Sequence, residues 1–291
     1  MNNNDATLSA GAGMAATGKR KKGWAVFFLA GLAMALGFIP VAILKAPAEK
    51  REPPPVVIRI DDIQDYAFRE GQVFLLTESM TADIPVSLAV IPGEFGEDLG
   101  IVQMVKLAVG LGSEVTVHGW EHEDLASLSA EEQAALLGLG RGRLAEVIGC
   151  DSKVLVPPMF RFNEATISAM QQAGYEIISS FIDVSYPGLY SGVKSVPGTV
   201  NLSQYSENDL TWNMKTTDAV EAEIAVSVEK YGYAVIVTHP QEFLVAEALT
   251  EANVALYRAL LVALQEHYCF KTIKELGESR LFSPMPSKEL P

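Results

Sequence analysis

Two histidines four residues apart follow a strand-like apolar run near the middle of the chain. His118 and His122 lie in the segment EVTVHGWEHEDL, which runs from Glu114 to Leu125, and they are two of the four histidines present. Imidazole is the side chain best suited to bind a transition metal or to move a proton near neutral pH. The pair therefore points to one shared ion if other parts of the chain supply the remaining ligands.

Other polar side chains also follow strand-like segments. Asp61 and Asp62 come directly after VVIRI, and His239 comes directly after AVIVT. Taken singly, each has an ordinary explanation, since aspartates often form turns or helix caps and a lone histidine is more often structural than catalytic. Independent turns and caps have no reason to gather at the same end of several strands, however. Their joint placement therefore indicates one site that draws on several strands.

The elements that must position these residues alternate along the chain. Strand-like and helical segments follow each other in the order expected for a parallel sheet, either a barrel or a doubly wound sheet, in which ligands gather at the carboxyl ends of the strands. A long irregular stretch at 183–213 interrupts the alternation. The predicted strands are 56–60, 84–91, 114–117, 154–157, 176–179, 234–239 and 270–273, and the predicted helices are 66–80, 98–111, 129–148, 163–173, 217–230 and 250–267.

The chain begins with a basic tail and one long apolar run. Residues 1–23 are predicted to form a cytoplasmic disordered tail, and residues 24–44 contain no charge over a length that can cross about 30 Å of hydrocarbon as a helix. The basic cluster at 19–22 places the N-terminus inside, so a single-pass cell-membrane protein with its later residues outside is expected. A cleaved signal peptide is the alternative, although the run exceeds the usual apolar region of such a peptide. Residues 45–55 are predicted to be a proline-rich spacer.

Charge and cysteine content limit the partners. The chain has 22 basic and 36 acidic residues, and its basic tail makes the remainder still more acidic. Such a surface repels nucleic acid, which is therefore excluded as a partner. Cys150 and Cys269 could pair outside the cell or stay as free thiols, and the sequence leaves both open, as it does the oligomeric state.

The order of four short motifs resembles that of the polysaccharide deacetylase family, carbohydrate esterase family four. The motifs are RIDD (59–62), HGWEH (118–122), VPPMF (156–160) and VTHP (237–240), and the resemblance covers about 56–275. It implies an α/β fold, a distorted (β/α) barrel, as a catalytic domain over 56–280, preceded by the transmembrane helix and followed by a tail at 281–291. It also implies a membrane-anchored hydrolase that removes N-acetyl groups from a glycan.

The resemblance further implies a role for each motif residue. Asp61 is expected to be the general base and His239 the general acid, while Asp62, His118 and His122 are expected to hold one divalent metal ion, most simply zinc, with cobalt, nickel or manganese as alternatives. The residues expected to contact the substrate are Pro158, Phe160, Arg161 and Trp212.

The sequence departs from the family pattern in one important place. The family has an arginine that contacts the base just before the proline pair, and here that position is Val156. Arg59 or Arg161 could replace it. The family's motif with aspartate and tryptophan is matched only loosely by Asp209 and Trp212. The metal site is thus better supported than the substrate site.

Two other functions fit parts of the pattern. His118, Glu121 and His122 match the H-x-x-E-H signature of an inverted zinc peptidase, which requires the segment to be helical. A Gly-Trp pair directly after a strand is a poor helix start, which argues against it. A non-catalytic glycan-binding or scaffold domain on the same barrel is the second alternative, because of the missing arginine. The presence of Asp61 and His239 argues against that alternative, since a binder needs neither a base nor an acid.

Overall fold

The computed structural model describes residues 52–206 and 211–282, which belong to one compact unit beginning at Arg51. The predicted tail at 1–23, the predicted membrane span at 24–44 and most of the spacer lie outside the described residues. Within the described part of the chain, no helix is both long enough and apolar enough to cross a membrane.

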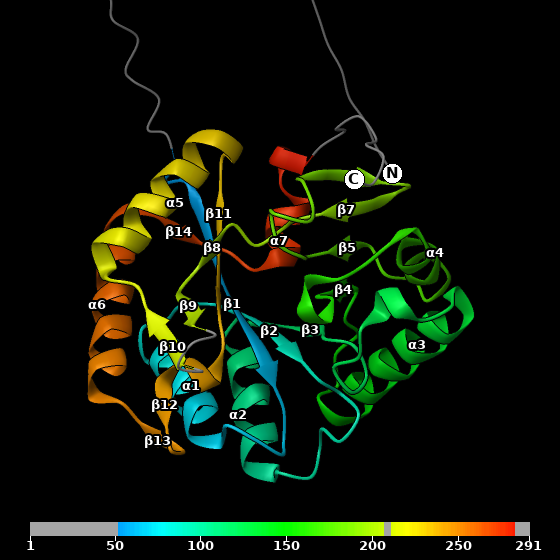
Figure 1. The fold of residues 1–291 in the computed structure, drawn as a ribbon, viewed down its shortest axis with the longest axis horizontal. Helices are drawn as coiled ribbons and strands as arrows, with labels where there is room; N and C mark the ends of the chain where they lie inside the picture. The colour runs from blue at the N-terminus through cyan, green and yellow to red at the C-terminus, as the bar shows by residue number, and fades with distance from the viewer. Residues whose placement is uncertain (1–51, 207–210, 283–291) are drawn as a thin grey trace, which may run out of the picture. The chain divides into compact units, whose positions relative to one another are not determined.

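One curved sheet organises this unit (Figure 1). Its order is β6-β7-β5-β4-β3-β2-β1-β11-β8, with β14 also paired to β1, and every neighbouring pair is parallel except β6 with β7. The strands are β1 (Pro55–Ile63), β2 (Ser87–Val90), β3 (Glu114–Val117), β4 (Val154–Leu155), β5 (Ile177–Ile178), β6 (Gly188–Tyr190), β7 (Val193–Ser195), β8 (Val200–Asn201), β11 (Ala234–Thr238) and β14 (Cys269–Phe270).

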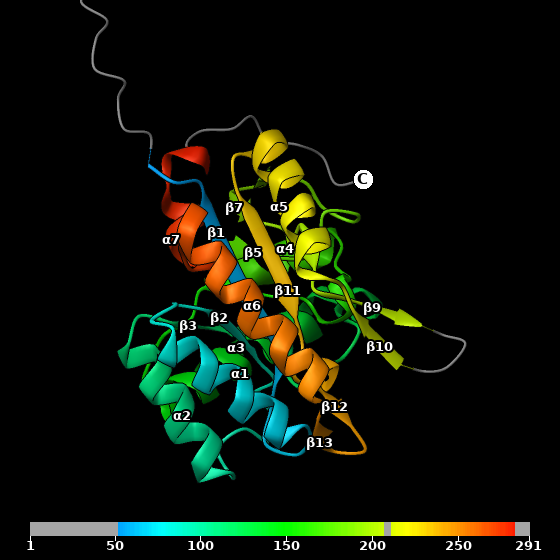
Figure 2. The same ribbon diagram turned by 90° about the vertical axis from the view of Figure 1, so that its left-hand side faces the viewer.

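Helices cover the outside of this sheet in chain order, and neighbouring pairs α1 with α2, α3 with α4 and α5 with α6 are in contact (Figures 1 and 2). These crossover helices bury the outer face of the sheet, and side chains of the strands and of α7 fill the apolar end of its interior, which is why the strands are mostly apolar. The helices are α1 (Arg69–Thr81), α2 (Leu99–Gly110), α3 (Ala130–Val147), α4 (Glu164–Gln172), α5 (Thr217–Tyr231), α6 (Glu251–His267) and α7 (Ile273–Glu278).

The two faces of β1 pack in two different parts of the interior. Val56, Ile58 and Ile60 join the larger core under the outer helices, whereas Val57 joins a smaller cluster formed with α7. Because side chains alternate along a strand, Arg59 and Asp61 fall on the same face as Val57. Both are fully buried, so the interior of the curved sheet carries apolar packing at one end and charge at the other.

The short helix α7 closes the apolar end of that interior. It packs on β1, and Gly277 lies so close to β5 that a β-carbon there would be 2.8 Å from Cδ1 of Ile177. The opposite end of the interior, where the parallel strands finish, is therefore the end available to a ligand.

The sequence prediction was correct for the alternating elements and incomplete elsewhere. The expected distorted barrel is an open, curled half-barrel, because β6 and β8 form its edges and are not paired with each other among the described strands. The stretch 183–213, predicted to be irregular, contains β6 to β8 and part of a hairpin formed by β9 (Ser203–Ser206) and β10 (Thr211–Met214). A second hairpin joins β12 (Leu244–Val245) and β13 (Ala248–Leu249). The predicted strand at 270–273 ends early because Thr272 caps α7.

Candidate metal centre and active site

A bulge at the end of β1 places two consecutive aspartates in the site. Ile60 pairs with Leu88 and Ile63 pairs with Val90, so β1 holds one more residue than β2 over this interval. Asp62 is in this bulge, and its φ of 61° lies in the left-handed region, which aspartate tolerates better than most residues. A regular strand would send the two carboxylates to opposite faces, and the bulge instead allows both to serve one centre.

Three side chains from distant parts of the chain converge beyond that bulge. Oδ1 of Asp62 lies 3.2 Å from Nε2 of His118 and 3.4 Å from Nε2 of His122. Ligand atoms bound to one tetrahedral zinc ion at about 2.1 Å lie about 3.4 Å apart. The donor set of two imidazoles and one carboxylate, with all three ligand atoms within 4.8 Å of one another, therefore fits a divalent ion with further positions open.

The ligands are themselves held in orientation by hydrogen bonds. Nδ1 of His118 lies 2.8 Å from the carbonyl oxygen of Val156, which fixes the proton on Nδ1 and turns the lone pair of Nε2 toward the site. Oδ2 of Asp62 accepts a hydrogen bond of 2.8 Å from Nε2 of Gln241. Gln241 therefore occupies the second carboxylate oxygen and leaves Oδ1 facing the two histidines.

The segment from His118 to His122 is a turn and not a helix. Gly119 has φ of 72°, and a β-carbon there would lie 2.9 Å from Cγ of Pro158, which packs beneath the turn. The carboxylate of Glu123 accepts hydrogen bonds from the backbone N–H groups of Trp120 and Glu121. The alternative of an inverted zinc peptidase required a helix here, so the geometry contradicts it.

Electrostatics within the ligand set are strong. Burial alone would raise the pKa of Asp62, but its close contacts with the imidazoles of His118 and His122 outweigh it and hold that pKa far below its ordinary value. The pKa of His122 is raised, chiefly by its hydrogen bond to Asp62, against the opposing effect of burial. A carboxylate that is ionised at all ordinary pH values is a suitable permanent ligand for a cation.

Of the two arginines considered as replacements for the one missing at position 156, Arg59 contacts the predicted base. Its Nε and Nη2 donate to the two oxygens of Asp61 at 2.8 and 2.7 Å, in complete burial. Nη1 donates to the carbonyl oxygens of Ser179 and Ser180 and to Oγ of Ser179. Arg59 therefore fixes the predicted base and also ties β1 to the segment after β5 across the interior of the half-barrel.

The other predicted arginine lies elsewhere. The side chain of Arg161 is 63% exposed and forms an ion pair of 3.0 Å with Asp124 on the surface. Phe160 lines the pocket described below, and its ring centroid lies 5.5 Å from Cζ of Arg59. Of the four residues predicted to contact substrate, Phe160 and Trp212 line that pocket, Pro158 supports the histidine turn, and Arg161 does neither.

The imidazole of His239 is hydrogen-bonded to a carboxylate at Nδ1 and stacked against a tryptophan ring on one face. Its Nδ1 lies 2.8 Å from Oε1 of the buried Glu242, whose other oxygen accepts a hydrogen bond from Oγ1 of Thr238. Trp212 stacks on the imidazole with ring centroids 5.5 Å apart. Burial alone would lower the pKa of His239, but Glu242 and the nearby Asp61 and Asp62 raise it to about 9. His239 is thus a cationic acid at neutral pH.

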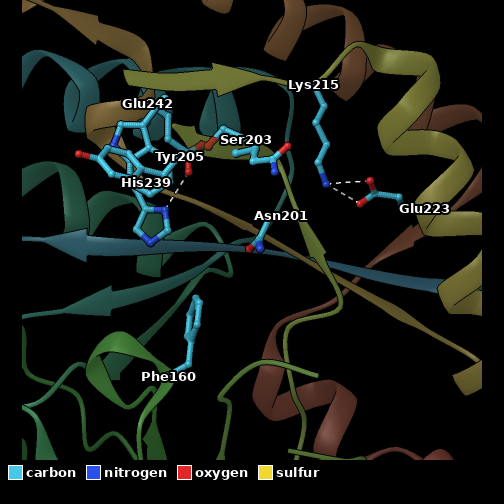
Figure 3. A pocket seen from close by; sticks show the side chains of 10 residues that line it. Phe160, Asn201, Ser203, Tyr205, Lys215, Glu223, His239 and Glu242 are labelled. Carbon is cyan, nitrogen blue, oxygen red and sulfur yellow. Dashed lines mark hydrogen bonds and ion pairs between the residues drawn. The ribbon is translucent and has the colours of Figure 1, made fainter. Parts of the chain in front are cut away.

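A pocket of about 470 Å³ opens beside His239 (Figure 3). His239 and Phe160 lie at one end of the view, Lys215 and Glu223 lie at the other, and Asn201 lies between them. The pocket is lined by Phe160, Asn201, Ser203, Gln204, Tyr205, Trp212, Lys215, Glu223, His239 and Glu242.

Sequence reasoning missed part of this site. Gln241 and Glu242 follow His239 in the segment HPQEF. Their position near the predicted mouth was compatible with contact to substrate or support of His239, and the sequence did not decide between these roles. Tyr205, Lys215 and Glu223 lie in or after the stretch predicted to be irregular, and no pattern distinguished them. Both cysteines, Cys150 and Cys269, are free thiols.

Several solved structures share this fold. A candidate polysaccharide deacetylase from Mycobacterium smegmatis superposes with a TM-score of 0.59 at 17% identity, covering 84% of this chain and 98% of its own. A family 4 acetyl xylan esterase from Clostridium thermocellum, solved with a cobalt ion, gives 0.53 at 14% identity and covers 77% and 90%. A family 4 pseudoenzyme from Bacillus anthracis gives 0.53 at 14% identity and covers 78% and 66%.

Sequence comparison gives a second, independent result. No curated protein matches the chain. Residues 51–178 match the model of the polysaccharide deacetylase family, and this range contains the two aspartates of β1 and both histidines of the turn after β3. The fold, the metal-ligand geometry and the matched residues lead to one conclusion: over residues 51–178 the chain is similar to the polysaccharide deacetylase family.

Proposed function

We propose that this protein is a metal-dependent hydrolase that removes N-acetyl groups from a glycan. The observation that carries the proposal is the convergence of Asp62, His118 and His122 on one point, with Asp61 next to Asp62 on β1 and His239 directly after the neighbouring strand β11. The ligand set suits zinc, and cobalt, nickel and manganese remain compatible with two nitrogens and one oxygen.

When bound, a divalent ion at these ligands supplies a Lewis acid for the acyl carbonyl and lowers the pKa of a water molecule. Asp62 contributes one negative charge to the ion through Oδ1, because Gln241 occupies its other oxygen. The carbonyl oxygen of Val156 accepts a hydrogen bond from Nδ1–H of His118, which leaves the lone pair of Nε2 available to the ion. The chain therefore orients Asp62 and His118 before an ion arrives.

Asp61 is the proton acceptor in this proposal. Arg59 binds both of its oxygens and fixes the carboxylate at the end of β1, and each oxygen retains a second lone pair that can accept a proton from the attacking water. Because Arg59 is held in turn by Ser179 and Ser180, the carboxylate cannot rotate away. This rigidity supports a positioned general base.

His239 is the proton donor to the leaving group. An amine is a poor leaving group unless it is protonated as the C–N bond breaks, and an imidazolium beside Glu242 can donate that proton from Nε2. An alkoxide from an ester needs this proton less. The pKa of about 9 for His239 therefore supports its role as the proton donor.

We also propose that residues 24–44 anchor the protein in the cell membrane with its catalytic unit outside. The support is the uncharged length of that segment and the basic cluster that precedes it at 19–22. Polymeric glycans of a cell envelope would then lie within reach of the active site.

A non-catalytic glycan-binding protein is the second candidate function. The specific observation in its favour is that Asp61 is fully buried and that both of its oxygens are bound by Arg59. One solved structure with the same fold is also a pseudoenzyme.

Acetate release distinguishes the two functions. Purified full-length protein should release acetate from chitin oligomers or peptidoglycan fragments, with little from simple acetyl esters, and a chelator should abolish the reaction. Asp61→Asn should retain the metal and lose turnover, whereas Asp83→Asn should behave as wild type because Asp83 is exposed and asparagine tolerates its φ of 55°. Binding of the same oligomers without any release of acetate would favour the second candidate.

A further inference from the structure

The position of the acid determines where the sugar must lie. In the proposed reaction the group that leaves with a proton from His239 is the amine of the amino sugar, so the ring that carries this amine lies on the His239 side of the metal ligands. The pocket beside His239 contains Asn201 and Ser203 from the neighbouring strand β8 and the residues that follow it (Figure 3). The sugar therefore extends from the metal centre toward the β8 edge of the sheet.

The walls of this pocket have the composition that a pyranose ring requires. Tyr205 and Trp212 contribute adjacent aromatic rings with centroids 5.0 Å apart, and Phe160 contributes a third ring. Aromatic faces pack on the apolar C–H face of a sugar ring, while Asn201 and Ser203 can exchange hydrogen bonds with its hydroxyls. The 470 Å³ volume lies within the range of small-molecule sites, about 300–1,000 Å³.

The charges in the pocket are paired. Nζ of Lys215 lies 2.8 and 2.7 Å from the two oxygens of Glu223, and His239 is paired with Glu242. Each of the two cations that line the pocket thus already has a carboxylate partner. An anionic substituent on the sugar would have to displace Glu223 from Lys215 and would meet the repulsion of two carboxylates in the process.

We propose, on the basis of the function proposed above, that the pair of Lys215 and Glu223 excludes sugars carrying a carboxylate group from this pocket and so restricts the site to neutral sugar units. The ammonium group of Lys215 and the carboxylate of Glu223 can each form further hydrogen bonds with a ligand, because their side chains are 24% and 43% exposed, respectively. Donor and acceptor side by side suit hydroxyl groups, which both donate and accept. Lys215 and Glu223 are thus specificity-determining residues.

Two probes test this proposal in full-length protein. The neutral probe is a chitin tetramer, and the anionic probe is a glycan of alternating N-acetylglucosamine and N-acetylmuramic acid in which acetate release is scored only from the N-acetylmuramic acid units, whose own carboxylate would enter the pocket. The wild type should have a kcat/KM at least about tenfold higher on the neutral probe. Glu223→Gln should reduce that preference by about fivefold, mainly through KM for the anionic probe, because it leaves Lys215 without a partner. Lys215→Gln should increase the preference, because Glu223 then repels the carboxylate unopposed.

A matched control separates this local effect from the general charge of the protein. Lys153 and Glu176 form another lysine–glutamate pair, at 2.5 Å, that does not line the pocket, and Glu176→Gln removes the same charge there. The control should leave the preference unchanged. A wild type that prefers the anionic probe, or equal shifts in Glu223→Gln and Glu176→Gln, would overturn the proposal.

Binding to the Asp61→Asn variant distinguishes failure of this inference from failure of the proposed function. Suppose that neither probe releases acetate, but that Asp61→Asn binds the neutral probe more tightly than the anionic probe and the double variant Asp61→Asn with Glu223→Gln does not. The subsite assignment is then correct and the proposed hydrolase function is wrong. If both probes are deacetylated equally and bind equally, the hydrolase stands and the subsite assignment is wrong.

Discussion

Arg59 and Asp61 lie two residues apart on one face of β1 and form a two-point ion pair from which water is excluded. The pair lies inside the half-barrel, and Arg59 continues from it to the carbonyl groups of Ser179 and Ser180. A side chain that orients the predicted base therefore also links strands that are separated in the sheet by β2, β3 and β4.

Removing Arg59 should unfold the protein more readily and abolish its activity. Arg59→Met leaves Asp61 as an unpaired buried charge, which costs about 3–5 kcal/mol in the free energy of unfolding. The double variant Arg59→Met with Asp61→Asn should recover most of that loss without recovering turnover. Urea denaturation followed by fluorescence measures the free energy of unfolding of each variant, and acetate release measures its turnover. Arg161→Met is the exposed control. Equal destabilisation by Arg59→Met and Arg161→Met would show that the buried pair has no special role.

Replacing Gln241 should weaken metal binding. Gln241→Leu frees Oδ2 of Asp62 from its hydrogen bond, so the carboxylate can rotate, and loss of such a partner typically lowers metal affinity by about 10–100-fold. Titration of the metal-free protein with zinc, followed by calorimetry, gives the affinity directly. Gln265→Leu, which removes a hydrogen bond to Ala82 on the surface, should leave the affinity unchanged. An unaltered zinc affinity in Gln241→Leu would refute the orienting role.

The rate should depend on pH through His239. Burial lowers the pKa of His239, but Glu242 and the nearby aspartates raise it by a larger amount, so that the pKa is about 9. The protonated form that donates to the amine is then present below about pH 9, so kcat/KM should fall as the pH rises through that value. Glu242→Gln removes the main source of the increase and should move this fall by about one pH unit or more toward neutrality. A profile with the same alkaline limb in both proteins would exclude His239 as the acid.

Stability should decrease between about pH 4.5 and pH 7 because of Glu114. Burial raises the pKa of this carboxyl to about 7 from its ordinary value of 4.5, despite its hydrogen bonds from Ser87 and from the backbone of Lys274. The folded state therefore holds a proton that the unfolded state has released, and stability is lost as the pH rises from about 4.5 to 7. Glu114→Gln should be more stable than the wild type by about 1–3 kcal/mol at pH 8 and similar at pH 4. Chemical denaturation at the two pH values measures this difference.

The sequence was informative wherever a local pattern corresponds to one structure. Continuous apolar runs of four to eight residues predicted the central strands, and the helix predicted at 129–148 begins at a capping box in which Ser129 and Glu132 make both capping hydrogen bonds. The same rules failed in the stretch 183–213. Its strands are two to four residues long, and their pairing depends on neighbours distant in the chain and not on their own periodicity.

The candidate site divides in a similar way. Asp62, His118 and His122 were predicted as metal ligands from their motifs, and the structure brings all three together. The replacement of the missing arginine could only be narrowed to two candidates, because sequence does not show that Arg59 and Asp61 share a fully buried face. Glu242, as the partner of His239, required the geometry of the short turn that follows β11.

By itself, the sequence determined which chemical groups this protein has and the ends of the strands at which they lie, because the type of a side chain and the periodicity of a strand are local properties. The tertiary structure alone decided which groups meet. A bulge in β1, the curl of an open sheet and the β9–β10 hairpin bring Asp62 to the histidines, Arg59 to Asp61, and Trp212 to His239, and none of these contacts is encoded by residues close together in the chain except the pair on β1.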